Sequence, residues 1–142
     1  MKKLETYLHF NGTCAEAMRF YEKTLGGKAT LLPAKDAPDP SIFGPGNADK
    51  IMHSKLETDD AILMASDWLA SDPYPGMSGF YVTLSVPTAE EGKRLFDTLA
   101  GSGRVHMPYG KTFYSDGFGM CVDRFGTPWM VMAETNSQTT GS

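Results

Sequence analysis

Apolar and polar positions follow the same order in both halves of the chain. In the first half, short apolar runs at 7–10, 29–32, 51–57 and 61–65 predict strands, and an apolar stripe at helical spacing follows Thr13. In the second half, runs at 80–86, 104–107, 113–122 and 127–133 predict strands, and a second helix ends at Gly101. Each half therefore predicts one helix and four strands in the order β-α-β-β-β.

The two predicted helices are copies of one sequence pattern. Residues 13–22 align without a gap to residues 88–97, at a constant offset of about 75 residues. Thr13 with Glu16, and Thr88 with Glu91, have the spacing of a capping box, in which a threonine oxygen accepts a hydrogen bond from an early helix N–H. The repeat predicts two copies of one supersecondary unit.

The repeat and the turn signals set the expected domain organisation. We expect an α+β fold in one domain over 1–135, with module one at about 4–70 and module two at about 79–135. A proline-rich loop at 33–50 and a second punctuated stretch at 71–79 interrupt the pattern. Residues 136–142 hold only small and polar residues, which predicts a flexible tail.

Charge and hydropathy exclude several classes of function. The 142-residue chain has a net charge of −4, and its 13 basic residues form no cluster, so we expect no nucleic-acid partner. No apolar run approaches the roughly 18 residues of a membrane helix. Glu5 and His9 interrupt any apolar core of a signal peptide, so a cytoplasmic protein is expected.

The two cysteines, Cys14 and Cys121, belong to no metal-binding or redox spacing. We interpret both as small buried apolar residues. The alternative is a reactive thiol at Cys14, because the first turn of a helix lowers the pKa of a thiol.

Several segments, in order along nearly the whole chain, resemble the vicinal oxygen chelate superfamily, and within it the PhnB-like proteins. That superfamily includes glyoxalase I, extradiol dioxygenases and bleomycin-binding proteins. The resemblance implies two βαβββ modules that form a curved mixed sheet around a concave pocket, with the helices outside, a small-molecule ligand and a homodimer. The segments that carry it are 7–12 with 16–21, 62–67, 91–100, 118–119 and 123–130.

The PhnB-like family has also been labelled 3-demethylubiquinone-9 3-methyltransferase-like. No glycine-rich strand-to-helix loop followed by an acidic residue supports a nucleotide-like cofactor here. We predict no cofactor of that kind.

Catalytic members of the superfamily hold a divalent metal with His, Glu or Gln side chains from the first and last strands of each module. On this chain those positions fall on Tyr81, Met130 and Ile62, which are poor donors for magnesium, manganese or zinc. We therefore predict no metal site of the usual kind. If a metal binds, a rearranged ligand set would use Glu5, His9, His53 and Glu134.

The first strand leaves two alternatives open. The gapless repeat places Thr6 opposite Tyr81, whereas alternation directs Leu8 and Phe10 toward the helix and Glu5, Tyr7 and His9 toward the pocket. A slip of one residue exchanges the two faces of a strand.

Three functions follow from these patterns. The first is a small-molecule-binding protein without the usual metal. The second is a metal-dependent lyase, transferase or dioxygenase with the rearranged ligand set, and the third is an interaction domain with a vestigial pocket.

His106 is expected to be an ordinary strand residue. The pocket candidates are Tyr7, His9, His53, Asp67, Trp68, Tyr81, Phe113 and Met130.

Overall fold

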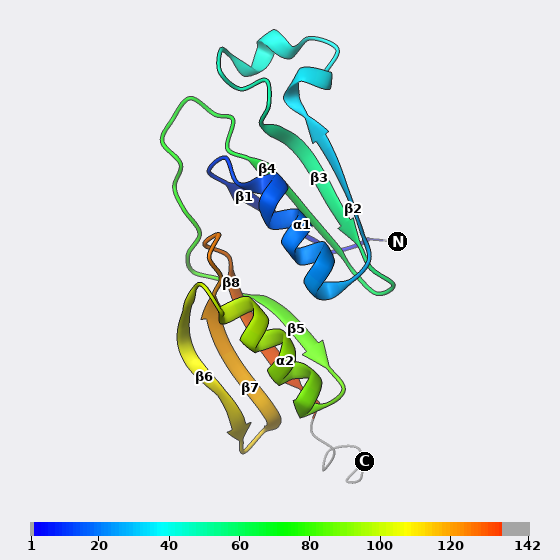
Figure 1. The fold of residues 1–142 in the computed structure, drawn as a ribbon, viewed down its shortest axis with the longest axis vertical. Helices are drawn as coiled ribbons and strands as arrows, with labels where there is room; N and C mark the ends of the chain where they lie inside the picture. The colour runs from blue at the N-terminus through cyan, green and yellow to red at the C-terminus, as the bar shows by residue number, and fades with distance from the viewer. Residues whose placement is uncertain (1, 135–142) are drawn as a thin grey trace. The chain divides into compact units, whose positions relative to one another are not determined.

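Each half of the chain folds as one helix laid against a four-stranded mixed sheet (Figure 1). The computed structural model describes residues 2–134. The predicted tail at 136–142 lies outside the described residues. The chain divides into two compact units, Met1–Gly76 and Met77–Ser142. Each unit contains one complete βαβββ module, as the sequence pattern predicts.

The first unit contains α1 and four strands, and two short 3-10 helices lie in the proline-rich loop. The elements are β1 (Thr6–Phe10), α1 (Cys14–Leu25), β2 (Lys28–Pro33), 3-10 helices Ala34–Asp36 and Pro40–Phe43, β3 (Ile51–Glu57) and β4 (Ile62–Asp67).

The second unit repeats this order. Its elements are β5 (Val82–Val86), α2 (Ala89–Ala100), β6 (Arg104–Thr112), β7 (Ser115–Val122) and β8 (Pro128–Ala133). Strand β6 extends well beyond the predicted end at Met107, because its pairing with β7 continues through three register irregularities.

Strand order is also the same in the two sheets. The orders are β1-β4-β3-β2 and β5-β8-β7-β6, so the first and last strands of each module are neighbours. These two strands run parallel, with Thr6 opposite Leu63 in the first sheet and Val82 opposite Trp129 in the second. All other neighbouring strands are antiparallel.

The structure decides between the two alternatives for β1. Leu8 and Phe10 are 2% and 0% exposed, and the Phe10 ring lies 6.4 Å from the ring of Tyr21 on α1. Tyr7 and His9, which alternate with them, are exposed on the opposite face of the sheet. The alternation of apolar and polar residues therefore predicts correctly that Leu8 and Phe10 face the helix.

The gapless repeat fails at the turn that follows β1. Three residues separate Phe10 from the start of α1 at Cys14, whereas only two separate Val86 from the start of α2 at Ala89. The strands therefore correspond at an offset one residue larger than that of the helices. In the repeat, the residue that corresponds to Tyr81 is thus Glu5 rather than Thr6.

The two helices begin in different ways. Thr88 accepts a 3.2 Å hydrogen bond from the amide of Glu91, which confirms that cap. Thr13 makes no side-chain cap hydrogen bond, so that part of the prediction is wrong. Instead, the Asp67 carboxylate at the end of β4 accepts a hydrogen bond from the Cys14 amide. A carboxylate at this place also interacts favourably with the positive end of the helix dipole.

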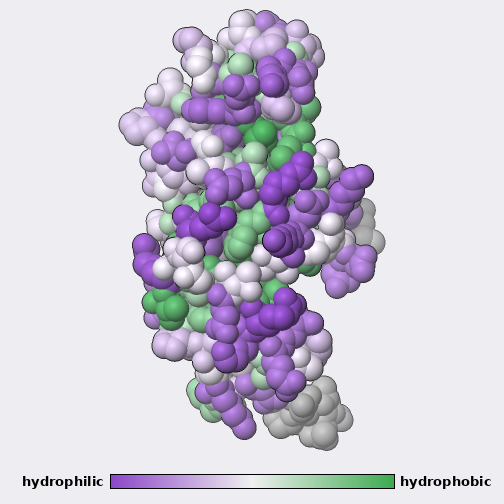
Figure 2. All heavy atoms as spheres, in the orientation of Figure 1, coloured by the Kyte–Doolittle hydropathy of each residue, from purple (hydrophilic) through white to green (hydrophobic). Residues whose placement is uncertain are grey.

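The surface is mixed in polarity. Hydrophilic, neutral and smaller apolar regions are interspersed on the face that Figure 2 shows. Among residues 2–134, no helix is long and apolar enough to cross a membrane.

Candidate functional site

Aromatic and imidazole rings gather on the face of the first sheet opposite α1. Tyr7 and His9 lie on β1, His53 lies on β3, and Trp68 and Tyr74 follow β4. Their ring centroids are 5.2 Å apart for Tyr7 and His9, 5.7 Å for Tyr7 and His53, 5.5 Å for His9 and Trp68, and 6.1 Å for Trp68 and Tyr74. We call these five residues the aromatic face.

Hydrogen bonds fix the two imidazoles of the aromatic face. The Tyr7 hydroxyl lies 3.0 Å from Nδ1 of His53, and the Ser66 hydroxyl lies 3.0 Å from Nδ1 of His9. The parallel pairing of β1 with β4 places Ser66 directly opposite His9. Because both contacts use Nδ1, the Nε2 atom of each ring is the nitrogen open to a ligand.

The stretch after β4 closes against the same face. The Tyr74 hydroxyl donates a 2.7 Å hydrogen bond to the His9 carbonyl, and the Trp68 indole N–H donates a 2.8 Å hydrogen bond to the Asp72 carbonyl. Partial burial raises the pKa of the Tyr74 phenol, so this side chain remains a neutral donor. Tyr7 is nonetheless 41% exposed, and thus the face is both ordered and open.

Asp67 lies on the other side of this sheet, although it precedes Trp68 directly in sequence. It is 3% exposed, and its two oxygens accept hydrogen bonds of 2.9 Å from the Cys14 amide and 2.8 Å from the Ile51 amide. The carboxylate thus joins the start of α1 to the start of β3. Its position is that of a structural residue.

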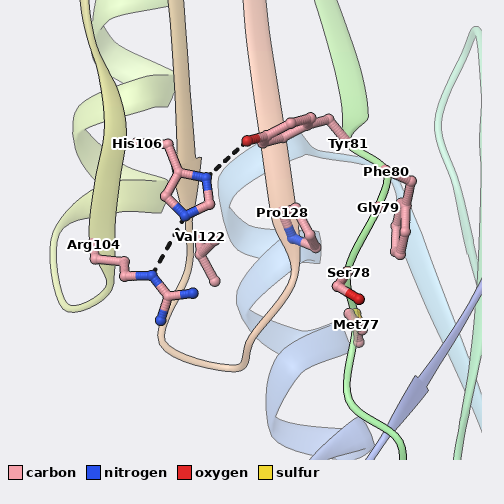
Figure 3. A pocket seen from close by; sticks show the side chains of 9 residues that line it. All are labelled: Met77, Ser78, Gly79, Phe80, Tyr81, Arg104, His106, Val122 and Pro128. Carbon is pink, nitrogen blue, oxygen red and sulfur yellow. Dashed lines mark hydrogen bonds between the residues drawn. The ribbon is translucent and has the colours of Figure 1, made fainter.

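The remaining pocket candidates belong to the second unit. Tyr81 immediately precedes β5 and lines a pocket of about 310 Å³ with Arg104 and His106 (Figure 3). Met130 is half-buried on β8 opposite Thr83, and Phe113, in the turn between β6 and β7, is 98% exposed. The structure brings Tyr7, His9, His53 and Trp68 together, and it does not bring Phe113 or Met130 to the pocket that Tyr81 lines.

Four residues of these two places were not predicted from the sequence: Ser66, Tyr74, Arg104 and His106. The β1–β4 pairing would have identified Ser66 as the partner of His9. Tyr74 lies in a linker without periodicity, so no pattern signals its return to His9. Arg104 and His106 are two residues apart on a strand, a spacing that places both side chains on one face.

The donors predicted for a rearranged metal site do not complete one. His9 and His53 flank Tyr7, while Glu5 is exposed before β1 and Glu134 follows β8 in the second unit. Within residues 2–134, no three His, Cys, Asp or Glu side chains gather so as to hold a metal ion. The donor set of the first unit therefore stops at two imidazoles, and no reaction step through a metal follows from it.

The structure contradicts a reactive thiol at Cys14. Burial is the largest cause that raises the pKa of Cys14 to about 12, and the nearby Asp67 carboxylate adds to it. Burial likewise raises the pKa of Cys121 to about 11. Both cysteines are 0% exposed, as expected for apolar core residues, and both are free thiols.

Comparison with known proteins agrees with this fold. Residues 3–131 match the family described as the Glyoxalase/Bleomycin resistance protein/Dioxygenase superfamily. The chain is 35% identical over 140 residues to "Protein YjdN" of Escherichia coli (strain K12), covering 90% of this chain and 92% of that protein.

Two solved structures show the same architecture. Protein PA1353 from Pseudomonas aeruginosa has a TM-score of 0.88 and 43% identity, over 94% of this chain and 98% of that one. A putative 3-demethylubiquinone-9 3-methyltransferase, PhnB protein, from Bacillus cereus has a TM-score of 0.75 and 24% identity, over 93% and 99% of the two chains. The predicted superfamily and the PhnB-like fold are thus confirmed.

Proposed function

Since the chain belongs to the Glyoxalase/Bleomycin resistance protein/Dioxygenase superfamily, we propose that it binds a small organic molecule on the aromatic face. The observation that carries this proposal is the row of rings from His53 through Tyr7, His9 and Trp68 to Tyr74, with successive centroids 5.2–6.1 Å apart. A soluble domain gains nothing in core packing from rings left open on this side, whereas a planar ligand can stack on them.

The chemistry of the face defines the ligand class. Tyr7 and Trp68 offer ring surfaces, and the Nε2 atoms of His9 and His53 offer hydrogen bonds that can be donated or accepted. None of these five side chains is an acid, a lysine or an arginine, although Glu5 and Lys55 lie on the same side of the sheet. These groups fit a neutral, planar, unsaturated molecule that carries an amide, hydroxyl or carbonyl group.

We propose further that binding needs no divalent metal. The aromatic face provides two imidazoles and no carboxylate, and a metal centre in a protein ordinarily takes three or more protein ligands. The predicted metal positions at Ile62, Tyr81 and Met130 offer no strong donor either.

A metal-dependent lyase, transferase or dioxygenase is the second candidate function. One observation favours it: His9 and His53 are both held through Nδ1, which is how a protein commonly orients a histidine whose Nε2 binds a metal. Elemental analysis of protein purified without chelator distinguishes the two candidates.

We also propose a homodimer that works in the cytoplasm. Exposed apolar side chains on β6 and its following turn, Val105, Met107 and Phe113, offer a surface for a second copy. Two unpaired buried thiols suit a reducing compartment. Light scattering should give twice the 15.5 kDa chain mass, and a particle of single-chain mass would reject the dimer.

The binding proposal is tested by calorimetric titration of 2-naphthamide, with saturated cyclohexanecarboxamide as the matched probe. We expect the planar amide to bind more tightly, and Trp68→Ala to weaken it about threefold to tenfold, because an aromatic pair is worth about 0.5–1.5 kcal/mol. Ile42→Ala, which removes an exposed apolar side chain of the proline-rich loop, is the control. Equal effects of the two substitutions, or equal affinity for both probes, would contradict the proposal.

A further inference from the structure

A pocket within the second unit is lined by both polar and apolar residues (Figure 3). Its volume of about 310 Å³ lies at the lower end of the range of small-molecule sites. Tyr81, Arg104 and His106 form the polar wall, in which Tyr81 and His106 point toward each other. The rest of the lining consists of Met77, Ser78, Gly79, Phe80, Val122 and Pro128.

Hydrogen bonds along the polar wall fix the direction of each proton. Arg104 can only donate, so its Nε–H donates to Nε2 of His106 over 3.4 Å. His106 must then carry its proton on Nδ1, and this N–H donates to the Tyr81 hydroxyl oxygen over 2.8 Å. The O–H group of Tyr81 is then available to donate a hydrogen bond to a ligand. The wall therefore presents a phenol donor and the terminal N–H groups of a guanidinium.

The charge of the pocket comes from one residue. Arg104 is always protonated, and His106 in the arrangement above is neutral. Within residues 2–134, Arg104 has no ion pair with a carboxylate, and no Asp or Glu lines the pocket. The pocket thus carries a single positive charge that no acidic side chain of the lining neutralises.

We propose that this pocket binds the carboxylate of a small organic acid whose apolar body packs on Val122 and Pro128. A planar carboxylate matches the fork of a guanidinium, and the Tyr81 O–H supplies a further donor. A single cation balances a monoanion, which favours a carboxylate over a phosphate dianion. The pocket belongs to the second unit and the aromatic face to the first, and the positive charge of the pocket calls for a ligand other than the neutral molecule proposed above.

Three probes test the proposal by calorimetry and NMR: phenylacetate, its neutral isostere phenylacetamide, and inorganic phosphate. We expect phenylacetate to bind most tightly, and Arg104→Gln to weaken it about tenfold to a hundredfold, the range for a hydrogen bond to a charged group. The control is Arg94→Gln on α2, which changes the net charge equally at an exposed position outside the lining. Equal weakening in both variants would overturn the proposal, as would tighter binding of phosphate or of the amide.

Three further measurements test the polar wall and its ligand. Tyr81→Phe should weaken phenylacetate about threefold to tenfold, because one neutral hydrogen bond is lost. Nitrogen NMR of His106 should show the tautomer protonated at Nδ1, and the opposite tautomer would overturn the proton order of the wall. Trp68→Ala should leave phenylacetate affinity unchanged, so failure at one site is distinguishable from failure at the other.

Discussion

The Asp67 carboxylate accepts a 2.9 Å hydrogen bond from the backbone amide of Cys14, the first residue of α1. Its second oxygen accepts a 2.8 Å hydrogen bond from the amide of Ile51, where β3 begins. One buried side chain thus satisfies a free N–H at the helix start and positions the helix on the sheet. The aromatic face lies on the opposite side of that sheet, so its geometry depends on this junction.

Replacing Asp67 with Asn should destabilise the protein by about 2–3 kcal/mol, because one acceptor becomes a buried donor that faces an amide N–H. Chemical denaturation measures the change. Asp49→Asn is the matched control in the same unit, since the Asp49 side chain is 90% exposed and its ion pair with Lys35 is worth at most about 1 kcal/mol. A loss at Asp67 no larger than that at Asp49 would show that the junction is not needed for stability.

Both thiols should be unreactive in the folded protein. The pKa of the Cys14 thiol is about 12, whereas an ordinary thiol has a pKa of 9.0. At weakly alkaline pH its thiolate fraction is therefore roughly a thousandfold lower than that of an ordinary thiol. An aromatic disulfide reagent should therefore release almost no colour until guanidinium unfolds the chain, after which both cysteines react. Rapid reaction of one thiol in native conditions would refute the burial of that residue.

The same shift makes stability depend on alkaline pH. Above pH 9.0 the unfolded chain releases the Cys14 proton, whereas the folded chain keeps it up to a pKa of about 12. The unfolded state then binds fewer protons, so the free energy of unfolding decreases with rising pH, by a slope approaching about 1.4 kcal/mol per pH unit. Below pH 9.0 this contribution is constant.

The test is a series of denaturation curves from pH 8 to pH 11 for the wild type and Cys14→Ala. The variant should lose less stability over this range, since one of the two shifted thiols is absent. The thiol of Cys121 has a pKa of about 11. Cys121→Ala should therefore also lose less stability than the wild type, over a narrower range of pH. Identical slopes in all three proteins would contradict the prediction.

Elemental analysis of protein purified without chelator should find far less than one equivalent of bound manganese, zinc or nickel. The physical reason is that the described residues offer two imidazoles on the aromatic face and no third donor beside them. One equivalent that disappears on His9→Ala, but persists on His106→Ala, would instead establish the metal-dependent alternative.

Much of the fold could be predicted from sequence because its signals are local. The two βαβββ units follow from apolar periodicity, from glycine at the helix ends and from the repeat between Thr13 and Thr88. The facing of β1 could be predicted from the alternation of Leu8 and Phe10 with Tyr7 and His9. The repeat offset misplaced Thr6, since the extra residue before α1 lies in a turn where apolar periodicity is absent.

The sites were less predictable because their contacts join distant residues. Tyr74 lies 65 residues from His9, and no pattern in its proline-rich linker shows that its hydroxyl reaches the His9 carbonyl. Asp67 and Trp68 are neighbours in sequence on opposite faces of a sheet. Only the pairing of β1 with β4 shows which of them joins the aromatic face.

Binding of a small molecule on the aromatic face of the first sheet is tested most directly by aromatic carbon NMR of the protein during a titration with 2-naphthamide. The ring signals of Tyr7, His9, His53 and Trp68 should shift together and saturate at one affinity, while those of Phe113 and Tyr114 stay unchanged. No saturable shift at Tyr7 and Trp68, or shifts confined to Tyr81 and His106, would contradict the claim.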